Sequence, residues 1–330
     1  LITSPFSLPN GGVYLGSTWQ KSMRLLEDFF RGVIPNAGYI LYRLLKIKNK
    51  IDAVIGVGDF IPPLLNWVFL RKKFYMIACA HTFLLKRSDK PLERLGRVTS
   101  YLFRKGCQKV YTRDRLTEQW FRQLGIPTSY LGFLGPDIQR EGGIRKKIIF
   151  LPGSRNDWKS NLQFCIEAIR KVNFQVLGQY SLHVVLSPGI NDQELYPLLP
   201  SILDVKPFSI SWSRGDYFQH LSQSALVVGF AGTAIEQAAF LGIPSIEPWR
   251  ERALQANQDF IENRQKLLLR DALIPGGNSP SQLAQTLENT LLRFPLFQKA
   301  AEDFSHLVWE GKSNGGWEIA KNIFLSLNTQ

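Results

Sequence analysis

The sequence predicts an α/β protein made of two domains, each built around a doubly wound parallel sheet. Short apolar runs rich in strand-forming residues alternate with longer runs of helical periodicity along the chain. The length of 330 residues suits two domains, because a usual domain has roughly 100–200 residues. Hydrophobic residues make up 45% and charged residues 20%, which is the composition of an ordinary folded protein.

The strand-like runs are mostly apolar throughout instead of alternating between apolar and polar residues. Strands that are covered by helices on both faces have this pattern, so we expect parallel sheets rather than antiparallel ones. The runs lie at residues 53–57, 74–80, 109–112, 148–151, 182–186, 208–212, 226–229 and 245–246. Helical patterns lie between and after them, at residues 92–103, 115–124, 160–172, 233–241, 252–266 and 280–292.

A domain boundary is expected within residues 136–145, which contain a proline, two glycines and few residues that could be buried. A new series of strands and helices starts just after it. We therefore assign residues 1–142 to a first domain and residues 143–330 to a second.

The basic charge is confined to the first half of the chain. The formal net charge is +13; residues 1–145 hold 23 Lys and Arg against 10 Asp and Glu, whereas residues 146–330 hold 17 of each kind. One interpretation is a solvated basic face. A nucleic-acid partner is not expected, because no recognition motif accompanies the charge.

Apolar and basic residues interleave in two stretches, 39–48 and 101–105, which favours an anionic membrane surface as the partner. An exposed amphipathic surface is expected from Tyr39, Leu41, Arg43, Leu44, Lys46 and Lys48. No apolar run approaches the roughly 20 residues of a membrane-spanning helix. The sequence thus predicts a cytoplasmic protein that associates peripherally with a membrane.

Three cysteines, Cys79, Cys107 and Cys165, lie far apart and have no metal-site spacing. A reducing compartment and no metal are the expectations. The chain opens at Leu1 without a methionine or a signal peptide, so we interpret it as part of a longer protein with an incomplete first domain.

A first candidate phosphate-binding turn follows the strand at 148–151. Gly153 and Ser154 are small residues before a helical pattern, and a helix N-terminus presents free N–H groups to a phosphate. Arg155 would add a bidentate charge against a diphosphate. The alternative is an ordinary glycine turn.

A second small-residue turn follows the strand at 226–229. Gly232 and Thr233 would offer N–H groups to phosphates, and Glu236 would accept both ribose hydroxyls, since a carboxylate can take two hydroxyl hydrogens. The alternative is that Glu236 interacts with the helix dipole or caps Thr233. The carboxyl ends of strands are where doubly wound sheets bind nucleotides, so both turns are expected at one crevice.

Two common nucleotide motifs are missing. No Gly-Lys-Ser/Thr sequence follows a strand, which disfavours ATP hydrolysis, and Gly56-Val57-Gly58 is only half of a dinucleotide fingerprint.

With these motifs in order, the sequence resembles bacterial lipid-A-disaccharide synthase, and more closely its cyanobacterial relatives, the lipid-A-disaccharide synthase-related proteins. The matching segments are 132–137, 151–155, 231–236 and 315–320, and the resemblance extends from about Asp52 to the end of the chain. It implies the GT-B fold, in which two Rossmann-like domains face a cleft. It also implies an inverting glycosyltransferase with a UDP-sugar donor in the second domain and no metal or other cofactor. The leading hypothesis adds a lipid or lipid-linked acceptor at the membrane-facing first domain.

The resemblance also assigns catalytic residues. Asp59 matches the family's aspartate, the general base that takes the proton of the acceptor hydroxyl; its alternative is a helix cap before Pro62. His81 is an alternative base or a structural histidine. Gln258 matches the amides that contact the donor sugar, and its alternative is a solvated helix face.

The chain departs from the family pattern at Trp158, where an acid is expected and Asp157 lies beside it, and the glycine-rich acceptor-side loop is absent. Three hypotheses stay open: the glycosyltransferase, a UDP-sugar 2-epimerase on the same scaffold, and a degenerate module that binds nucleotide or membrane. His183, His220 and His306 receive no role.

Overall fold

The structure is a computed structural model that describes residues 34–87, 90–91, 95–135, 145–155, 157–200, 204–230, 232–250, 257–309 and 314–328. The chain divides into two compact units. Unit 1 takes Leu1–His81, Arg94–Thr112 and Glu118–Ser129, and unit 2 takes Thr82–Glu93, Arg113–Thr117 and Tyr130–Gln330. The boundary predicted between residues 142 and 143 lies outside the described residues.

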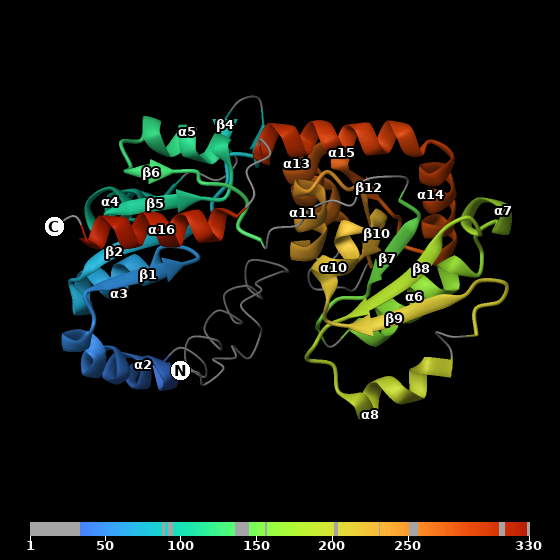
Figure 1. Ribbon diagram of the computed structural model, residues 1–330, viewed down its shortest axis with the longest axis horizontal. Coiled ribbons are helices and arrows are strands. Elements are labelled where there is room, and N and C mark those ends of the chain that lie inside the picture. Colours follow the sequence, from blue (N-terminus) through green and yellow to red (C-terminus); the bar gives the residue numbers. More distant parts are fainter. Residues whose placement is uncertain are drawn as a thin grey trace. The chain divides into compact units, whose positions relative to one another are not determined.

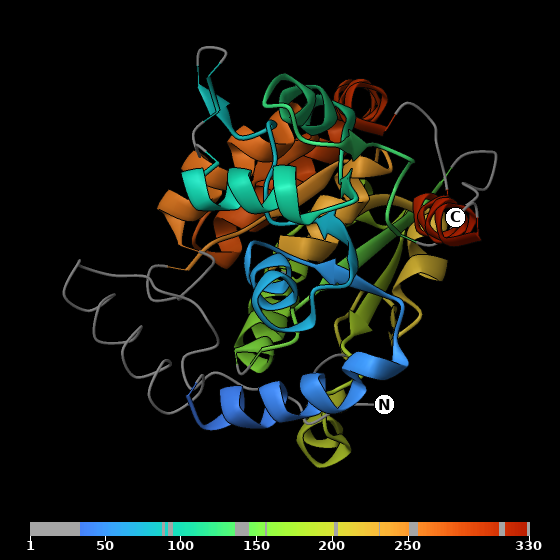
Figure 2. The same cartoon turned by 90° about the vertical axis from the view of Figure 1, so that its left-hand side faces the viewer.

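Unit 1 contains a parallel sheet in the order β1-β2-β5-β6. Its strands are β1 (Ala53–Val57), β2 (Lys73–Ala78), β5 (Lys109–Thr112) and β6 (Thr128–Ser129). The helical elements are α2 (Ile34–Ile47), η2 (Lys48–Lys50), α3 (Ile61–Leu65), η3 (Asn66–Leu70), α4 (Arg97–Gly106) and α5 (Arg115–Gln123), of which α5 begins in unit 2. Helix α2, blue in Figures 1 and 2, lies beside η3.

The surface predicted along α2 differs from the one observed. Tyr42, Leu45 and Lys46 are exposed, whereas Leu41 and Leu44 are half-buried, because α2 turns that side toward η3. The Lys48 ammonium donates to the Phe69 carbonyl at 2.8 Å, so part of its charge serves the fold. The side chain of Tyr39 lies outside the described residues.

Unit 2 contains a larger parallel sheet in the order β12-β11-β10-β7-β8-β9. Its strands are β7 (Lys147–Leu151), β8 (Ser181–Leu186), β9 (Ile210–Arg214), β10 (Ser224–Gly229), β11 (Ser245–Glu247) and β12 (Leu273–Pro275). This is the doubly wound order in which the chain starts in the middle, winds to one edge, and returns to wind to the other. The switch point lies between β7 and β10, which pair directly with Leu151 opposite Gly229.

The helical elements of unit 2 are α6 (Trp158–Ile169), α7 (Phe174–Leu177), α8 (Asp192–Leu195), η4 (Tyr196–Leu198), α10 (Tyr217–Ser222), α11 (Gly232–Phe240), α12 (Gln258–Phe260), η5 (Ile261–Gln265), α13 (Lys266–Leu269), η6 (Arg270–Ala272), α14 (Pro280–Leu292), α15 (Phe294–Trp309) and α16 (Gly315–Asn328). The antiparallel pair β3 (Lys86–Arg87) and β4 (Lys90–Pro91) also belongs to this unit. Helices cover both faces of the sheet (Figure 1).

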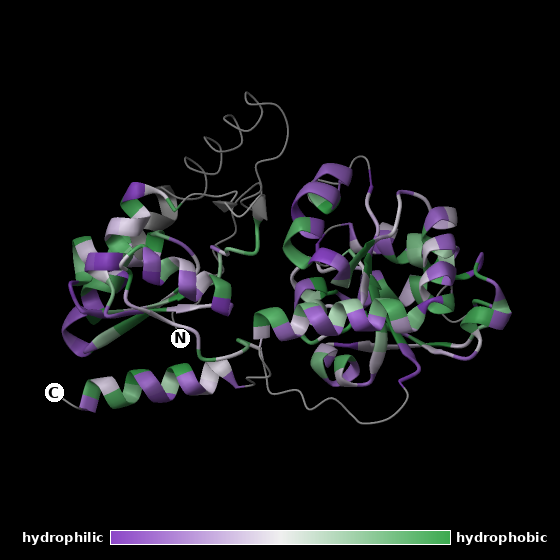
Figure 3. Ribbon diagram, turned by 90° about the horizontal axis from the view of Figure 1, so that it is seen from above, coloured by the Kyte–Doolittle hydropathy of each residue, from purple (hydrophilic) through white to green (hydrophobic). Residues whose placement is uncertain are grey.

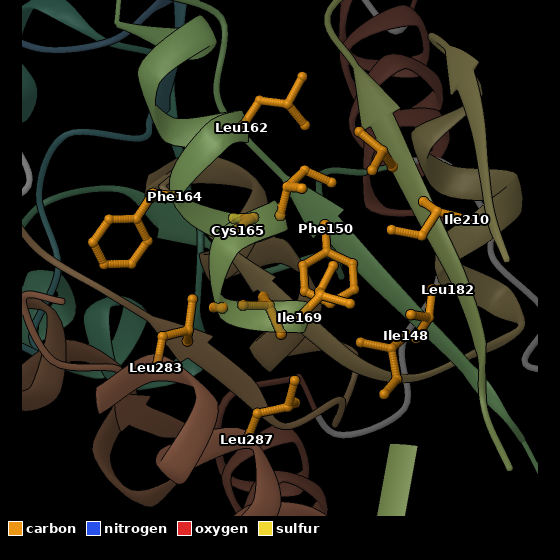
Figure 4. Packing of buried hydrophobic residues seen from close by; sticks show 14 of the residues in the cluster. Ile148, Phe150, Leu162, Phe164, Cys165, Ile169, Leu182, Ile210, Leu283 and Leu287 are labelled. Atoms are coloured by element: carbon orange, nitrogen blue, oxygen red, sulfur yellow. The ribbon is translucent and has the colours of Figure 1, made fainter. Parts of the chain in front are cut away.

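Two apolar cores hold the unit 2 sheet between its helices. On one face, Ile148 and Phe150 pack against α6 and α14 through Leu162, Ile169 and Leu287 (Figure 4). The opposite face packs against α11 and α15 through a second cluster that includes Ile149, Val227, Ile235, Ala238 and Phe304. Figure 3 shows these strands as largely hydrophobic and the long helices as striped, as expected for strands covered on both faces.

The prediction of an α/β protein with two parallel sheets is confirmed. Strands β1 and β5 and helix α14 have the predicted bounds, and the other predicted strands are shifted by at most a few residues. Strand β12 and helices α15 and α16 were not predicted.

Candidate functional site

Both predicted turns follow the strands that flank the switch point of the unit 2 sheet. β7 leads into residues 152–155 and β10 leads into residues 230–232. The Phe230 N–H donates to the Leu151 carbonyl at 2.9 Å, which ties the start of one turn to the end of the other strand. The sequence-predicted residues Gly153, Ser154, Arg155, Gly232, Thr233 and Glu236 therefore belong to one edge of one sheet.

The first turn leaves its polar groups accessible. Gly153 has a φ of +94°, a left-handed conformation that glycine adopts without strain, and Ser154 and Arg155 are exposed. The Asn161 amide donates to the Pro152 carbonyl at 3.0 Å and fixes the turn from within α6. An anion near the N-terminus of this 12-residue helix would also meet the positive end of its dipole.

Trp158, the departure from the family pattern, is the first residue of α6 and belongs to the buried core. Its side chain packs inward with Phe150 and Leu162 instead of facing the turn. The position therefore contributes packing where the resemblance implies an acid, and Asp157 beside it is exposed.

The second turn requires glycine at its start. A Cβ on Gly229 would lie 2.3 Å from the carbonyl oxygen of Leu151, which no side chain can do without separating β7 from β10. Helix α11 then begins at Gly232, with Thr233 exposed. Residue 231 lies outside the described residues.

Glu236 lies just beyond the first turn of α11, and its side chain is 23% exposed. Its Oε2 accepts a hydrogen bond from the Arg113 guanidinium at 3.0 Å, so the partner of the carboxylate is Arg113 instead of Thr233. A carboxylate has about four lone-pair sites, so Glu236 retains capacity for ligand hydroxyls.

Arg113 was missed by the sequence analysis. It is 18% exposed, and its guanidinium lies over the Phe240 ring at 5.2 Å, so an ion pair and a cation–π contact both fix it. The next residue, Asp114, is fully buried and accepts hydrogen bonds from the Thr117 N–H at 2.7 Å and from the Thr82 hydroxyl at 3.0 Å. Burial raises the pKa of Asp114, against the effect of Arg113 and these donors. The signal in the sequence is a charged pair directly after a buried strand.

Glu247 was also missed. It ends β11 and is only 1% exposed. Burial, and then the nearby charge of Glu236, raise the pKa of its carboxyl to about 8, so the group is a neutral acid at pH 7. Its Oε2 has no hydrogen-bond partner among the described residues.

The two predicted catalytic residues lie in unit 1, after neighbouring parallel strands. Asp59 follows β1 and His81 follows β2, and the Ala80 N–H donates to the Gly58 carbonyl at 3.4 Å between the two loops. Asp59 Oδ1 accepts at 3.1 Å from the N–H of Ile61, the first residue of α3, whereas the cap position of that helix is occupied by Phe60. The His81 ring stacks edge-on against Phe103 at 6.0 Å. Both catalytic roles stay predictions.

Gln258 is exposed at the start of α12, and its amide donates to Glu262 at 3.1 Å along the helix. This contact is the one expected of a solvated helix face. Its role against the donor sugar stays a prediction.

Two histidines that received no role lie together on unit 2, away from the turns. The rings of His183 and His220 are 3.9 Å apart. His183 bonds the hydroxyls of Ser211 and Ser213 at 2.6 and 2.9 Å, and Ser213 bonds His220 at 3.0 Å. Burial lowers the pKa of both imidazoles, and Lys147 lowers them further. The pair is therefore neutral at pH 7.

Among the described residues, no group of three or more His, Cys, Asp or Glu side chains is arranged to hold a metal ion. None of the helices in this part of the chain is long and apolar enough to cross a membrane.

Comparisons with known proteins support the architecture. No family model matches the sequence. No curated protein matches it either. The solved UDP-GlcNAc 2-epimerase from Neisseria meningitidis, bound to UDP-GlcNAc, has a TM-score of 0.55 and 15% identity, over 86% of this chain and 81% of that one.

Two further solved structures are similar. MurG of Acinetobacter baumannii has a TM-score of 0.53 and 15% identity, over 86% of this chain and 76% of that one. The spinosyn rhamnosyltransferase SpnG, complexed with thymidine diphosphate, has a TM-score of 0.50 and 12% identity, over 85% and 76%. Likeness at such identities shows the fold alone. The chain therefore has a fold of the GT-B type, with two open parallel α/β sheets.

Proposed function

We propose that this protein is an inverting glycosyltransferase that moves a sugar from a UDP-sugar to a lipid or lipid-linked acceptor at a membrane surface, like the lipid-A-disaccharide synthase-related proteins that its motifs resemble. The observation that carries the proposal is the position of Gly153–Arg155 and Gly232–Glu236 after β7 and β10, the strands at the switch point. Doubly wound sheets bind nucleotides at this point. The Neisseria epimerase of the same fold is bound to UDP-GlcNAc, which supports a UDP-sugar as the ligand.

The donor would be held by its diphosphate and its ribose. The N-terminal N–H groups of α6 and α11 and the exposed Arg155 would bind the diphosphate, and Glu236 would accept the ribose hydroxyls. The same positive groups stabilise the charge on UDP as it departs, so the proposal needs no metal or other cofactor.

In the proposed reaction, the acceptor hydroxyl oxygen attacks the anomeric carbon from the face opposite the diphosphate. The bond from this carbon to the phosphate oxygen breaks, UDP leaves with the electron pair, and the hydroxyl proton passes to Asp59. Because the one displacement occurs from the opposite face, the configuration inverts. Asp59 uses Oδ1 for the Ile61 N–H, which leaves Oδ2 for the proton. His81, on the neighbouring loop, is the alternative base.

The membrane part of the proposal rests on the surface of unit 1. Trp67 and Val68 of η3 and Val98 and Tyr101 of α4 are exposed, and the Trp67 and Tyr101 rings contact each other edge-on at 6.3 Å. The exposed face of α4 also carries three cations, Arg97, Arg104 and Lys105. No acidic residue occurs in residues 60–87 or 94–113. Exposed aromatic rings beside cations, in segments without acidic residues, suit an interface with anionic lipid.

Transfer of labelled sugar tests the proposal. The protein is incubated with a membrane lipid extract and a set of labelled UDP-sugars, and we expect label in the lipid fraction. Asp59→Asn should abolish the transfer, since the amide oxygen can still accept from the Ile61 N–H but cannot take a proton. Asp52→Asn, at an exposed position in the same unit, is the matched control. Label that stays in the aqueous phase with every UDP-sugar would refute the transferase.

A UDP-sugar 2-epimerase is the second candidate, favoured by the similarity to the Neisseria enzyme and by the second carboxyl, Glu247, beside Glu236. The same incubation separates the two reactions, because an epimerase changes the sugar while it is still joined to UDP. A degenerate nucleotide- or membrane-binding module would do neither.

A further inference from the structure

Behind the second turn, an ion pair and a buried acid lie together. Arg113 and Glu236 are joined at 3.0 Å, and the charge of Glu236 acts on Glu247. All three belong to unit 2. At pH 7 the cluster holds one positive charge, one negative charge and one neutral acid.

Glu247 faces α11 from the sheet. Ile246 belongs to the core that packs against α6 and α14, so the alternation of a strand directs Ser245 and Glu247 to the opposite face. That face is covered by α11, whose buried residues belong to the other core. Strand β11 packs against β10, β12 and α11, and Glu236 is the one titratable side chain that those three elements carry.

The buried carboxyl of Glu247 lowers the stability of the fold. A buried oxygen without a hydrogen bond costs about 1–3 kcal/mol, and a buried, unpaired carboxylate would cost more. An aliphatic residue at this position would remove the cost. An unpaired polar group that faces the N-terminal half of α11 suggests a role beyond packing.

We propose that Arg113 and Glu247 are positioning residues of the nucleotide site that act through Glu236. Arg113 fixes Oε2 of the Glu236 carboxylate and leaves its other lone pairs for the ribose hydroxyls. The neutral acid of Glu247 leaves Glu236 as the single negative charge of the cluster. This inference rests on the UDP site of the proposed function.

The position of Glu247 beside Glu236 makes the affinity for UDP depend on pH in the alkaline range. Above pH 8 Glu247 ionises, which sets a second negative charge beside Glu236 and close to an anionic ligand. The charge on bound UDP raises the pKa of Glu247 further, so the complex holds the proton more tightly than the free protein does. By linkage, affinity is constant well below pH 8 and falls as the pH rises through it, by at most about tenfold per pH unit.

Calorimetric titration with UDP at pH 7 and pH 9 tests the proposal. We expect the wild-type affinity to fall about three- to tenfold between these values. Glu247→Gln, whose amide does not titrate, should show no decline in affinity between pH 7 and pH 9. Arg113→Met should weaken binding about tenfold at pH 7, since Glu236 loses its orienting hydrogen bond, and Arg113→Lys should restore part of it. Glu167→Gln and Arg293→Met, at exposed positions of unit 2, are the matched controls.

The outcomes separate this inference from the proposed function. A wild-type protein that binds no UDP would overturn the proposed function and this inference with it. If UDP binds and Glu236→Ala weakens it, but Arg113→Met binds normally and wild type and Glu247→Gln share one pH profile, only this inference falls. If circular dichroism shows that Arg113→Met does not fold, the UDP affinity of Arg113→Lys and the pH profile of UDP binding by Glu247→Gln test the inference instead.

Discussion

Gly229 pairs with Leu151 beside the candidate site, where β7 leaves no space for a side chain on β10. Gly229→Ala would bring a methyl group to 2.3 Å from the Leu151 carbonyl oxygen, so the strands must separate at the switch point. We expect a loss of about 1–3 kcal/mol in unfolding free energy, the range for overpacking a well-packed site. Urea denaturation measures it.

The matched control for that substitution is Gly316→Ala in α16. A Cβ there meets no atom within 4 Å, and alanine favours a helix over glycine by about 0.5–1 kcal/mol. Equal stability of the two variants would show that the close approach at Gly229 has no energetic consequence.

Some single residues of the candidate site could be predicted from the sequence and others could not. The turns at Gly153 and Gly232 were predictable, because a strand, a small-residue turn and a helix are local patterns. Arg113 and Glu247 were not, because their partner Glu236 is 123 positions from Arg113 and on another element from Glu247. Only the tertiary fold brings such charges together. Asp59 lies one residue before the cap position of α3, which Phe60 occupies, and its catalytic role stays a prediction.

At the scale of elements, the imidazole pair joins three of them: His183 belongs to β8, His220 belongs to α10, and their serine partners belong to β9. His183 is 6% exposed, and its pKa is lowered from 6.5 to about 4 by burial, then by His220 and Lys147. The unfolded chain therefore takes up a proton at higher pH than the folded one. Stability is highest above pH 6.5 and falls as the pH drops from 6.5 toward 4, by up to about 3 kcal/mol.

Urea denaturation at pH 7.5 and pH 4.5 measures this loss. His183→Gln should reduce it, because the amide can still bond Ser211 and Ser213 but does not titrate. His306→Gln, at an exposed position of α15, is the control and should keep the wild-type pH dependence. A His183→Gln variant with the full wild-type loss would assign the acid sensitivity to other groups.

The elements that were predicted share a clear local signature. An apolar run such as 226–229 can be recognised from neighbouring residues alone. The same holds for the start of α14, where the Ser279 hydroxyl accepts a hydrogen bond from the Gln282 N–H. β12 is only three residues long and is set by pairing with β11. The histidine pair could not be predicted from the sequence, because it depends on the register of β8 with β9, in which His183 lies opposite Ser211.

At the scale of the whole molecule, the excess charge lies in the first half of the chain, and α4 presents part of it beside exposed aromatic rings. Reversing Arg97, Arg104 and Lys105 to Glu should release the protein from anionic vesicles, because each cation contributes about 1 kcal/mol near such a surface. UDP binding, which involves the other unit, should be unchanged.

Flotation with anionic vesicles at low and high salt measures that release, since salt screens exposed charges. Reversal of Lys171, Arg293 and Lys299, exposed cations of unit 2, is the matched control. Flotation that ignores both salt and the α4 reversal would mean that the basic half is only a solvated surface.

The central claim is that the switch point of the unit 2 sheet binds UDP with Glu236 on the ribose, and calorimetry with UDP tests it most directly. Glu236→Ala should weaken binding by about 1–3 kcal/mol, the range for lost hydrogen bonds to a charged group. Wild-type protein that binds UDP, with a folded Glu236→Ala variant that binds it less tightly by that amount, is the predicted result. Unchanged affinity in the folded variant would contradict the ribose assignment, and no binding by wild type would contradict the site itself.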